Sequence, residues 1–229
     1  MKKIFIKICK LFGFEIIDQN NFFSPSLNKE LNEDLSIINE KSIILPLGEV
    51  KITRKVSSLL IILRVNTEVE IWDQTKKRLF EQPKVEYTIR SIKSLINSIK
   101  FCENKYPDLK IKTVIIQDHS TNENIDKVKK LIEGKNIEVI SLNHEKFEKN
   151  INKQKTKETF SNLASLLQSF ETGSKQGKDL IFFVEDDYLH SEEMLEEMVS
   201  TYERVASQIN KDIFICPSDY PFLYMNNEK

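Results

Sequence analysis

The sequence predicts an α/β protein with a mostly parallel sheet, helices on both faces, and a smaller N-terminal appendage. From residue 58 onward, short apolar runs alternate with stretches in which apolar residues recur at helical spacing. The apolar runs are continuous, as in strands that are buried on both faces of a sheet. Helices between successive buried strands produce right-handed crossovers, and these make neighbouring strands parallel.

Residues 58–229 are expected to form the main domain, and residues 1–57 the appendage. The first 17 residues combine four lysines with several large apolar side chains. Such a segment is typical of a basic amphipathic helix, which either contacts an anionic membrane surface or packs on its own domain. Lys7 and Lys10 interrupt the apolar stretch, so a signal peptide is not expected. No run reaches the roughly 18 apolar residues that a membrane-spanning helix needs.

The rest of the appendage is predicted to be a polar arm followed by a hairpin. Residues 18–41 are rich in Asn, Ser and Glu, which is typical of a linker. Residues 42–45 and 49–53 are short candidate strands on either side of Pro46 and Gly48.

In the main domain, strands and helices are expected to alternate. The apolar runs predict strands at 59–63, 114–116, 137–142, 180–184 and 213–215. The helical periodicity predicts helices at 89–102, 125–132, 160–170 and 194–205. Ser120 or Thr121 is placed to cap the second of these helices, and Ser191 the fourth. The inner face of that fourth helix is expected to consist of Met194, Met198, Tyr202 and Val205.

Two long polar segments separate these elements. Residues 66–84 form a polar loop after the first strand, and Pro83 sits where the start of a helix tolerates proline. Residues 143–158 are highly charged and contain few apolar side chains, so we expect a mobile excursion there.

Composition limits the classes of partner and the compartment. The 229 residues include 34 basic and 35 acidic side chains, and this balance gives no support to nucleic acid as a partner. Cys9, Cys102 and Cys216 are far apart and odd in number, which argues against a disulfide framework or a structural zinc site. A reducing cytoplasm fits this cysteine usage.

Acidic side chains follow two of the predicted strands. Asp118 comes directly after the second strand, and Glu185, Asp186 and Asp187 come after the fourth. Unpaired buried carboxylates are costly, so a fold that places three at a strand end usually supplies a cation or a proton. With only five glycines the chain has no glycine-rich phosphate loop, and a carboxylate-bound Mg²⁺ or Mn²⁺ ion is the expected substitute.

The strand-QDHS, helix, strand, helix, strand-EDD pattern resembles the nucleotide-diphosphosugar glycosyltransferases of the GT-A fold, particularly the family-2-like group. The resemblance covers roughly residues 58–224. It implies that Asp118 contacts the base of the nucleotide and that the EDD run is the DxD-type metal signature. The EDD form is similar to that of the N-acetylglucosaminyltransferases of N-glycan processing. By that similarity Asp187 ligates the metal, and Glu185 and Asp186 lie near the ribose and the sugar.

The resemblance also implies a general base downstream of the metal signature. Asp219 is the candidate, because it is the downstream acid that follows a strand. Gln117 stands where many family members have a second acid, and no histidine follows His190. The chain ends ten residues after Asp219. We therefore expect a domain that is short at its C-terminal end, or an acceptor site completed by residues 1–57 or by a partner.

The function that these features predict is sugar transfer from a UDP- or GDP-linked donor to a polysaccharide or a lipid-linked glycan. A catalytically inactive GT-A-like domain that binds a glycan or a partner is an alternative. A sugar nucleotidyltransferase is a second alternative, although no glycine follows the first strand. A metal-free phosphate-binding α/β domain is a more distant one.

Several candidate residues have structural interpretations beside the functional one. Arg64 and Asn66 follow the first strand and are candidates for contact with the nucleotide or the diphosphate, but Arg64 would equally suit a surface salt bridge. Asp118 and Ser120 are also good helix-capping residues. His119 and His144 are expected at the surface. His190 lies close to the acids in the sequence and could be a ligand, but an exposed histidine at the start of a helix is the favoured interpretation.

Overall fold

The computed structural model describes residues 50–68, 82–151 and 156–217, together with the single positions 5, 9 and 12. Strands and helices alternate along the chain, with one additional short helix, α4. The elements are β1 (Ser58–Val65), α2 (Lys84–Lys105), β2 (Lys110–Gln117), α3 (Asn122–Ile132), β3 (Ile137–Ser141), α4 (His144–Phe147), α5 (Lys157–Gln176), β4 (Leu180–Glu185) and α6 (Met194–Ile209).

Four strands form one sheet in the order β3-β2-β1-β4, and every neighbouring pair is parallel. Arg64 of β1 lies opposite Ile116 of β2 on one side and opposite Glu185 of β4 on the other. The predicted α/β class and the parallel sheet are therefore confirmed. Parallel strands joined in this way all end at the same edge of the sheet, which we call the carboxyl edge.

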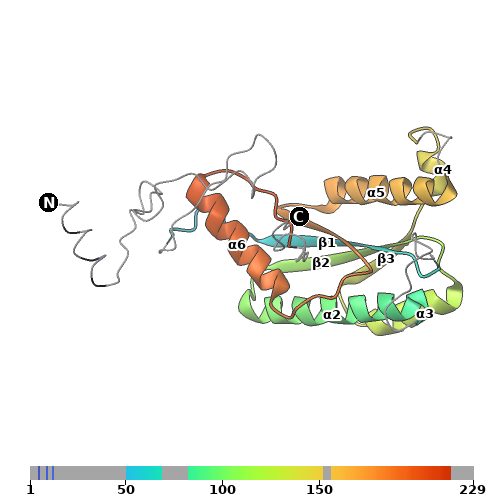
Figure 1. Ribbon diagram of the computed structural model, residues 1–229, viewed down its shortest axis with the longest axis horizontal. Helices are drawn as coiled ribbons and strands as arrows, with labels where there is room; N and C mark the ends of the chain where they lie inside the picture. The colour runs from blue at the N-terminus through green and yellow to red at the C-terminus, as the bar shows by residue number, and fades with distance from the viewer. Residues whose placement is uncertain are drawn as a thin grey trace, which may run out of the picture. The chain divides into compact units, whose positions relative to one another are not determined.

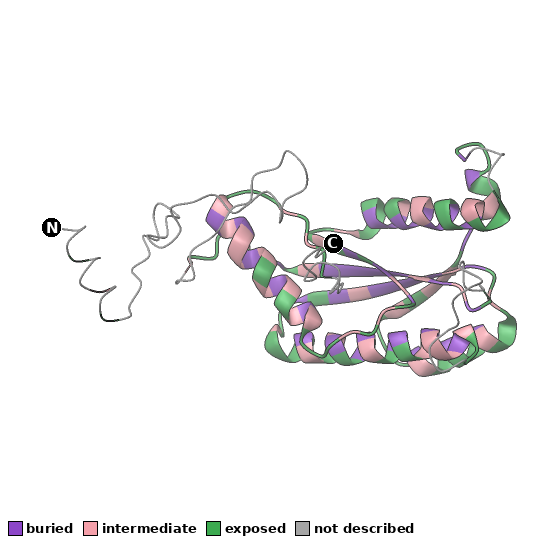
Figure 2. Cartoon of the chain, viewed as in Figure 1, coloured by how far each residue is buried: buried purple, intermediate pink, exposed green. Residues whose placement is uncertain are grey.

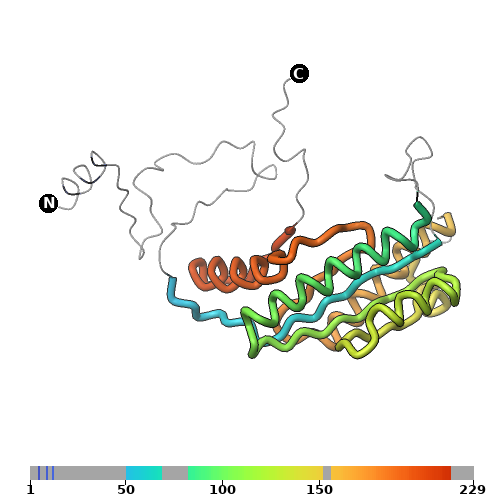
Figure 3. Tube along the Cα trace, turned by 90° about the horizontal axis from the view of Figure 1, so that it is seen from below, coloured from blue at the N-terminus to red at the C-terminus, as the bar shows by residue number. Residues whose placement is uncertain are grey.

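Helices cover both faces of the sheet. Helix α5 lies over one face, and α2 and α3 lie over the other (Figure 1). Helices α2 and α3 are in contact with each other, and Figure 3 shows this face from below. Successive side chains of a strand point to opposite faces, so a strand between two helical layers has to be apolar throughout. Ile61, Ile62 and Leu63 of β1 are fully buried, which satisfies this requirement (Figure 2).

The core beneath α5 includes part of the segment 143–158, which was predicted to be a mobile excursion. Helix α4 forms within it, and Phe147 and Ile151 are buried in the same apolar cluster as Ala164 of α5 and residues of β1 and β2. The prediction was wrong for the described part of the segment, because these two side chains anchor it to the core. Residues 152–155 lie outside the described ranges.

Helix α6 starts later and buries a different face than predicted. A turn at 192–193 precedes it, so the predicted cap, Ser191, lies three residues before the first helical residue. The N–H of Leu195 donates instead to Ser98 Oγ of α2, at 3.1 Å. The buried apolar side chains of the helix are Leu195, Val199 and Ala206. The predicted inner face is displaced by one position, because Leu195 enters the core in the first turn.

The chain divides into two compact units, Val56–Val199 and the pair of segments Met1–Lys55 and Ser200–Lys229. The first contains the whole sheet. In the second, Arg54 forms an ion pair of 2.5 Å with the Asp212 carboxylate, which also accepts a hydrogen bond of 2.9 Å from the Tyr202 hydroxyl.

Two predicted strands do not form. Residues 50–53, the described part of the second hairpin strand, have no strand conformation. Residues 213–215 have none either, and the Phe214 side chain between them is fully exposed. A three-residue apolar run without a neighbouring strand has no ladder to join. The predicted strand at 42–45 lies outside the described ranges.

Candidate functional site

The candidate site lies at the carboxyl edge, where the direction of chain winding reverses. From β1 the chain proceeds outward to β2 and β3, and it then returns to form β4 on the other side of β1. In open α/β sheets, ligands bind in the crevice outside the carboxyl ends of the strands at such a switch point. The switch point here lies between the ends of β1 and β4, at Val65 and Glu185.

The three consecutive acids at the end of β4 point in different directions. The register places Glu185 opposite Arg64, on the α5 face of the sheet. The next residue in a pleated strand points to the opposite face, and Asp186 accordingly meets α2. Asp187 lies in the turn that follows and is exposed. The local geometry thus separates three carboxylates that look equivalent in the sequence.

Arg64 links β1, β4 and α5. Its Nη2 forms an ion pair with Glu185, and its Nη1 donates to Asn162 Oδ1 at 2.7 Å and to Ser165 Oγ at 2.9 Å. Burial lowers the pKa of the guanidinium below its ordinary value, and the negative charges of Asp187 and Asp186 oppose that effect. A cation is therefore fixed at the switch point, within the field of two acids.

Asp186 is held by a buried ion pair that sequence reasoning missed. Its Oδ1 lies 2.8 Å from Nζ of Lys84, and its Oδ2 accepts a hydrogen bond from the Thr88 hydroxyl. The side chains of Lys84 and Asp186 are only 10% and 9% exposed. The one available signal for Lys84 was its position directly after Pro83, at the start of the helix that follows β1.

Asp187 is the acid that faces solvent. Among the residues that the structure describes, its carboxylate has no hydrogen bond or ion pair, and its charge interacts with the Arg64 guanidinium. An exposed carboxylate is a suitable donor for a hard divalent ion that keeps several of its own water molecules.

Asp118 lies at the same edge, after β2, and it is 6% exposed. Its N–H donates to the Val65 carbonyl oxygen at 2.8 Å, which extends the pairing of β1 and β2 by one residue. Its Oδ2 accepts a hydrogen bond from the hydroxyl of Ser161 in α5. Its Oδ1 lies 2.6 Å from Nδ1 of His119 and 2.8 Å from Nε2 of His144.

The two smaller candidates stabilise the loop after β1. The Asn66 side chain accepts a hydrogen bond of 3.1 Å from the Glu68 N–H, as in an Asx turn. Ser120 Oγ accepts the N–H of Thr67 at 3.3 Å. The cap of α3 is Thr121, whose side chain accepts the N–H of Asn124. These contacts give Asn66 and Ser120 a local structural role, and their contact with a nucleotide stays a prediction.

His119 is exposed, as predicted, whereas His144 and His190 are only partly exposed. His119 and His144 both contact Asp118, although they are 25 residues apart in the chain, and only the packing of α4 brings them together. His190 is half-buried, and burial lowers the pKa of its imidazole from 6.5 to about 4. The candidate base Asp219 lies outside the described residues.

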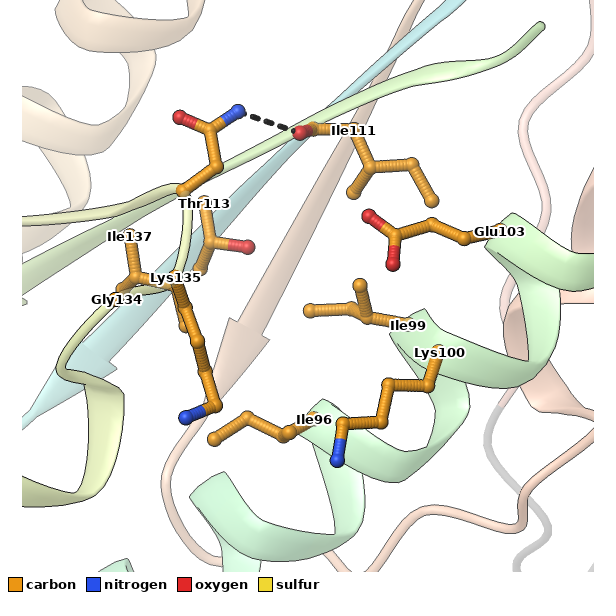
Figure 4. A pocket seen from close by; sticks show the side chains of 10 residues that line it. Ile96, Ile99, Lys100, Glu103, Ile111, Thr113, Gly134, Lys135 and Ile137 are labelled. Carbon is orange, nitrogen blue, oxygen red and sulfur yellow. Dashed lines mark hydrogen bonds between the residues drawn. The ribbon is translucent and has the colours of Figure 1, made fainter. Parts of the chain in front are cut away.

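A separate cavity of about 230 Å³ opens near the opposite edge of the sheet (Figure 4). Ile96 and Glu103 of α2 line it, together with Thr113 in the first half of β2 and Lys135 before β3. Ligands of open α/β sheets bind at the other edge, and neither the acids that follow β2 and β4 nor the histidines line this cavity. The cavity is therefore not part of the candidate site.

The fold and the site define an α/β protein with a polar, charge-rich carboxyl edge. Comparison with models of protein families, with curated proteins and with solved structures found no match. Within the described ranges, no helix has both the length and the apolar character required to cross a bilayer.

Proposed function

We propose that this chain is a metal-dependent glycosyltransferase of the GT-A type, which binds a nucleotide-diphosphosugar donor at the carboxyl edge. The observation that carries the proposal is the placement of Asp187. It is an exposed carboxylate at the switch point between β1 and β4, beside the fixed guanidinium of Arg64. The resemblance assigns the metal to this residue.

The charge arrangement suits a diphosphate. Crossover helices run back across the sheet, so α2, α3 and α5 begin at the carboxyl edge and direct the positive ends of their dipoles there. Arg64 adds a guanidinium group, which is paired with Glu185. A Mn²⁺ or Mg²⁺ ion fits the carboxylate donor of Asp187, and when bound it would offset the charge of the departing diphosphate.

The residues of this chain would divide the work at the donor. Asp187 would hold the ion, and Arg64 would stabilise negative charge on the phosphates. Glu185 and Asp186 would position Arg64 and Asp187, since each of the two acids is paired with a cation of the protein. Contact of these two acids with the ribose and the sugar, and of Asp118 with a UDP or GDP base, is part of the proposal. Asp219 is its candidate for the base that accepts the proton of the acceptor hydroxyl.

One observation favours the alternative of a catalytically inactive domain that binds a glycan or a partner. Two of the three acids at the end of β4 already have cationic partners within the protein. A single exposed carboxylate is sufficient for binding a metal and a nucleotide, and binding alone does not require turnover.

A thermal-shift titration with Mn²⁺ and UDP or GDP tests the proposal. We expect the melting temperature to rise only when metal and nucleotide are both present, and the rise to disappear in Asp187→Asn. Asp108→Asn is the matched control, because it removes an exposed acid before β2 at the other edge. No rise with either nucleotide, or the same rise in Asp187→Asn, would contradict the proposal. Hydrolysis of a donor sugar without acceptor then separates an active enzyme from an inactive domain.

A further inference from the structure

Three potential metal ligands meet at the carboxyl edge, on the strands that lie away from β4. Asp118 and His119 follow β2, and His144 is the first residue of α4, after β3. Because β2 and β3 are parallel neighbours, their ends meet at one edge. One ligand atom from each of the three residues lies within 4.8 Å of the other two.

The backbone around these residues sets their positions before any ion binds. His119 has a φ of 48°, the left-handed conformation that few non-glycine residues adopt. Such conformations occur disproportionately at functional sites. On the other side, Asn143 caps α4 by accepting the Lys146 N–H, and its own N–H donates to Gln168 Oε1 of α5 at 2.9 Å. These contacts fix the residue that precedes His144.

The side chains are fixed as well. The two imidazole rings meet edge to face with centroids 4.9 Å apart, and the His144 ring stacks on Phe160. The Ser161 hydroxyl donates a hydrogen bond to Oδ2 of Asp118. That leaves Oδ1 for the two imidazoles, so the carboxylate would bind an ion through one oxygen. A ligating carboxylate that is itself hydrogen-bonded is the usual supporting arrangement at metal sites.

We propose that Asp118, His119 and His144 form a binding site for a divalent transition metal, with Zn²⁺ as the best match. Two imidazole nitrogens and one carboxylate oxygen are the ligand types that Zn²⁺ takes in sites with three protein ligands and one open position. His119 is exposed and His144 is partly exposed, so the fourth position faces solvent.

The distances are compatible with this assignment after a small adjustment. Metal–ligand bonds of about 2.0–2.1 Å in a tetrahedron place the ligand atoms about 3.3 Å apart. The present separations from Asp118 Oδ1 are 2.6 Å to His119 and 2.8 Å to His144. Rotation of the two rings that moves the nitrogen atoms outward by about 0.5–0.7 Å would open the space.

The site shares Asp118 with the proposed donor site, but it needs neither Asp187 nor a nucleotide. Asp187 offers oxygen alone and suits Mg²⁺ or Mn²⁺, whereas the Asp-His-His group offers nitrogen and suits Zn²⁺. The proposal also gives Asp118 a role that needs no nucleotide. If this role is right, the metal binds the free protein.

Calorimetric titration of Zn²⁺ into the full chain, without a histidine tag and stripped of metal, tests the site. We expect one equivalent to bind, and we expect the affinity to fall by about 100-fold or more in His119→Asn and in His144→Gln. Asparagine is used at position 119 because it tolerates the positive φ of that residue. His190→Gln is the matched control and should bind as the unaltered chain does. Circular dichroism of each variant shows whether it is folded.

Co²⁺ provides a second readout that does not depend on the loss of a ligand. In His119→Cys the thiolate would replace the imidazole, and a sulfur-to-metal absorption band should appear that the unaltered chain lacks. The proposal is overturned if no stoichiometric Zn²⁺ binding occurs, or if folded His119→Asn and His144→Gln bind normally. It is also overturned if His190→Gln abolishes binding. None of these measurements involves a nucleotide, so the result stands apart from that of the Mn²⁺ and UDP titration.

Discussion

The Arg64 guanidinium and the Glu185 carboxylate form an ion pair between adjacent parallel strands, because the register of β1 and β4 sets the two residues directly opposite each other. The pair joins β1 to β4 at the switch point. Arg64 also donates to Asn162 and Ser165 of α5, so one side chain connects two strands with the helix above them. The stability of this edge and its charge therefore depend on the same residue.

Replacement of Arg64 by methionine should destabilise the protein by about 2 kcal/mol, because it leaves several polar partners without their donor. Glu185→Gln should cost less, about 1 kcal/mol, since the Glu185 side chain is 45% exposed and water can replace its partner. Urea unfolding followed by circular dichroism measures both values. Equal losses in the two variants would show that Arg64 has no additional role in fixing α5.

Lys84 and Asp186 form the more deeply buried pair, and we expect a larger effect there. Asp186→Asn should cost about 3 kcal/mol, because a buried ammonium group then lacks its counter-charge. In the double variant Lys84→Met/Asp186→Asn, part of this loss should be recovered, with a coupling of about 1–3 kcal/mol in a double-mutant cycle.

The pair Lys112–Glu138 is the control for this cycle. It has a similar length, 2.9 Å, but both of its side chains are more than 40% exposed. Exposed pairs contribute at most about 1 kcal/mol. The interpretation of Lys84 and Asp186 would be wrong if their coupling were no larger than that of this surface pair.

The sequence predicted the sheet and the edge that carries the site, because both depend on local patterns. Continuous apolar runs such as 59–63 are specific for strands buried on both faces. Once these strands are parallel, the acids at the ends of β2 and β4 must lie at one edge. The direction of each acid could not be predicted as readily, since it depends on the exact residue at which the strand ends. Glu185 is the last residue of β4, and Asp187 lies two residues beyond it.

The partners of the acids were not predictable, because they come from distant parts of the chain. Lys84 reaches Asp186 across 102 residues, and Ser161 reaches Asp118 across 43. Neither residue belongs to a motif with fixed spacing. The contact of His144 with Asp118 was not predicted for another reason. The segment 143–158 is so highly charged that its two buried apolar side chains, Phe147 and Ile151, were not recognised as part of the core.

Substitution of either of two glycines should destabilise the protein, and the reason differs between them. A Cβ atom at Gly177 would lie 2.6 Å from the Ile181 side chain and 2.7 Å from the carbonyl oxygen of Gly173. Gly177→Ala should therefore destabilise the protein by about 1–3 kcal/mol through overpacking. Gly134 has open space around it, but its φ is +73°. Gly134→Ala should cost about 1 kcal/mol through backbone strain alone.

An asparagine at each position separates the two causes. Gly134→Asn should recover much of the loss, because asparagine tolerates the left-handed conformation. Gly177→Asn should be at least as unstable as Gly177→Ala, since the larger side chain meets the same atoms. Thermal unfolding of the four variants measures the effects. Recovery by asparagine at Gly177, or none at Gly134, would contradict the assignment.

His190 should make the stability of the protein fall as the pH is lowered from 7.5 to 5. Burial lowers the pKa of its imidazole from 6.5 to about 4, and its Nε2 has no hydrogen-bond partner in the described structure. Below about pH 6.5 the imidazole of His190 therefore binds a proton in the unfolded chain but not in the folded protein. The free energy of unfolding falls between about pH 6.5 and pH 4 and levels off below that. The loss by pH 5 should be about 1–2 kcal/mol, because the partly exposed ring reduces the full effect of the shift. Urea unfolding at several pH values should give a flatter dependence for His190→Phe than for the unaltered chain, whereas parallel curves would show that His190 titrates normally in the folded state.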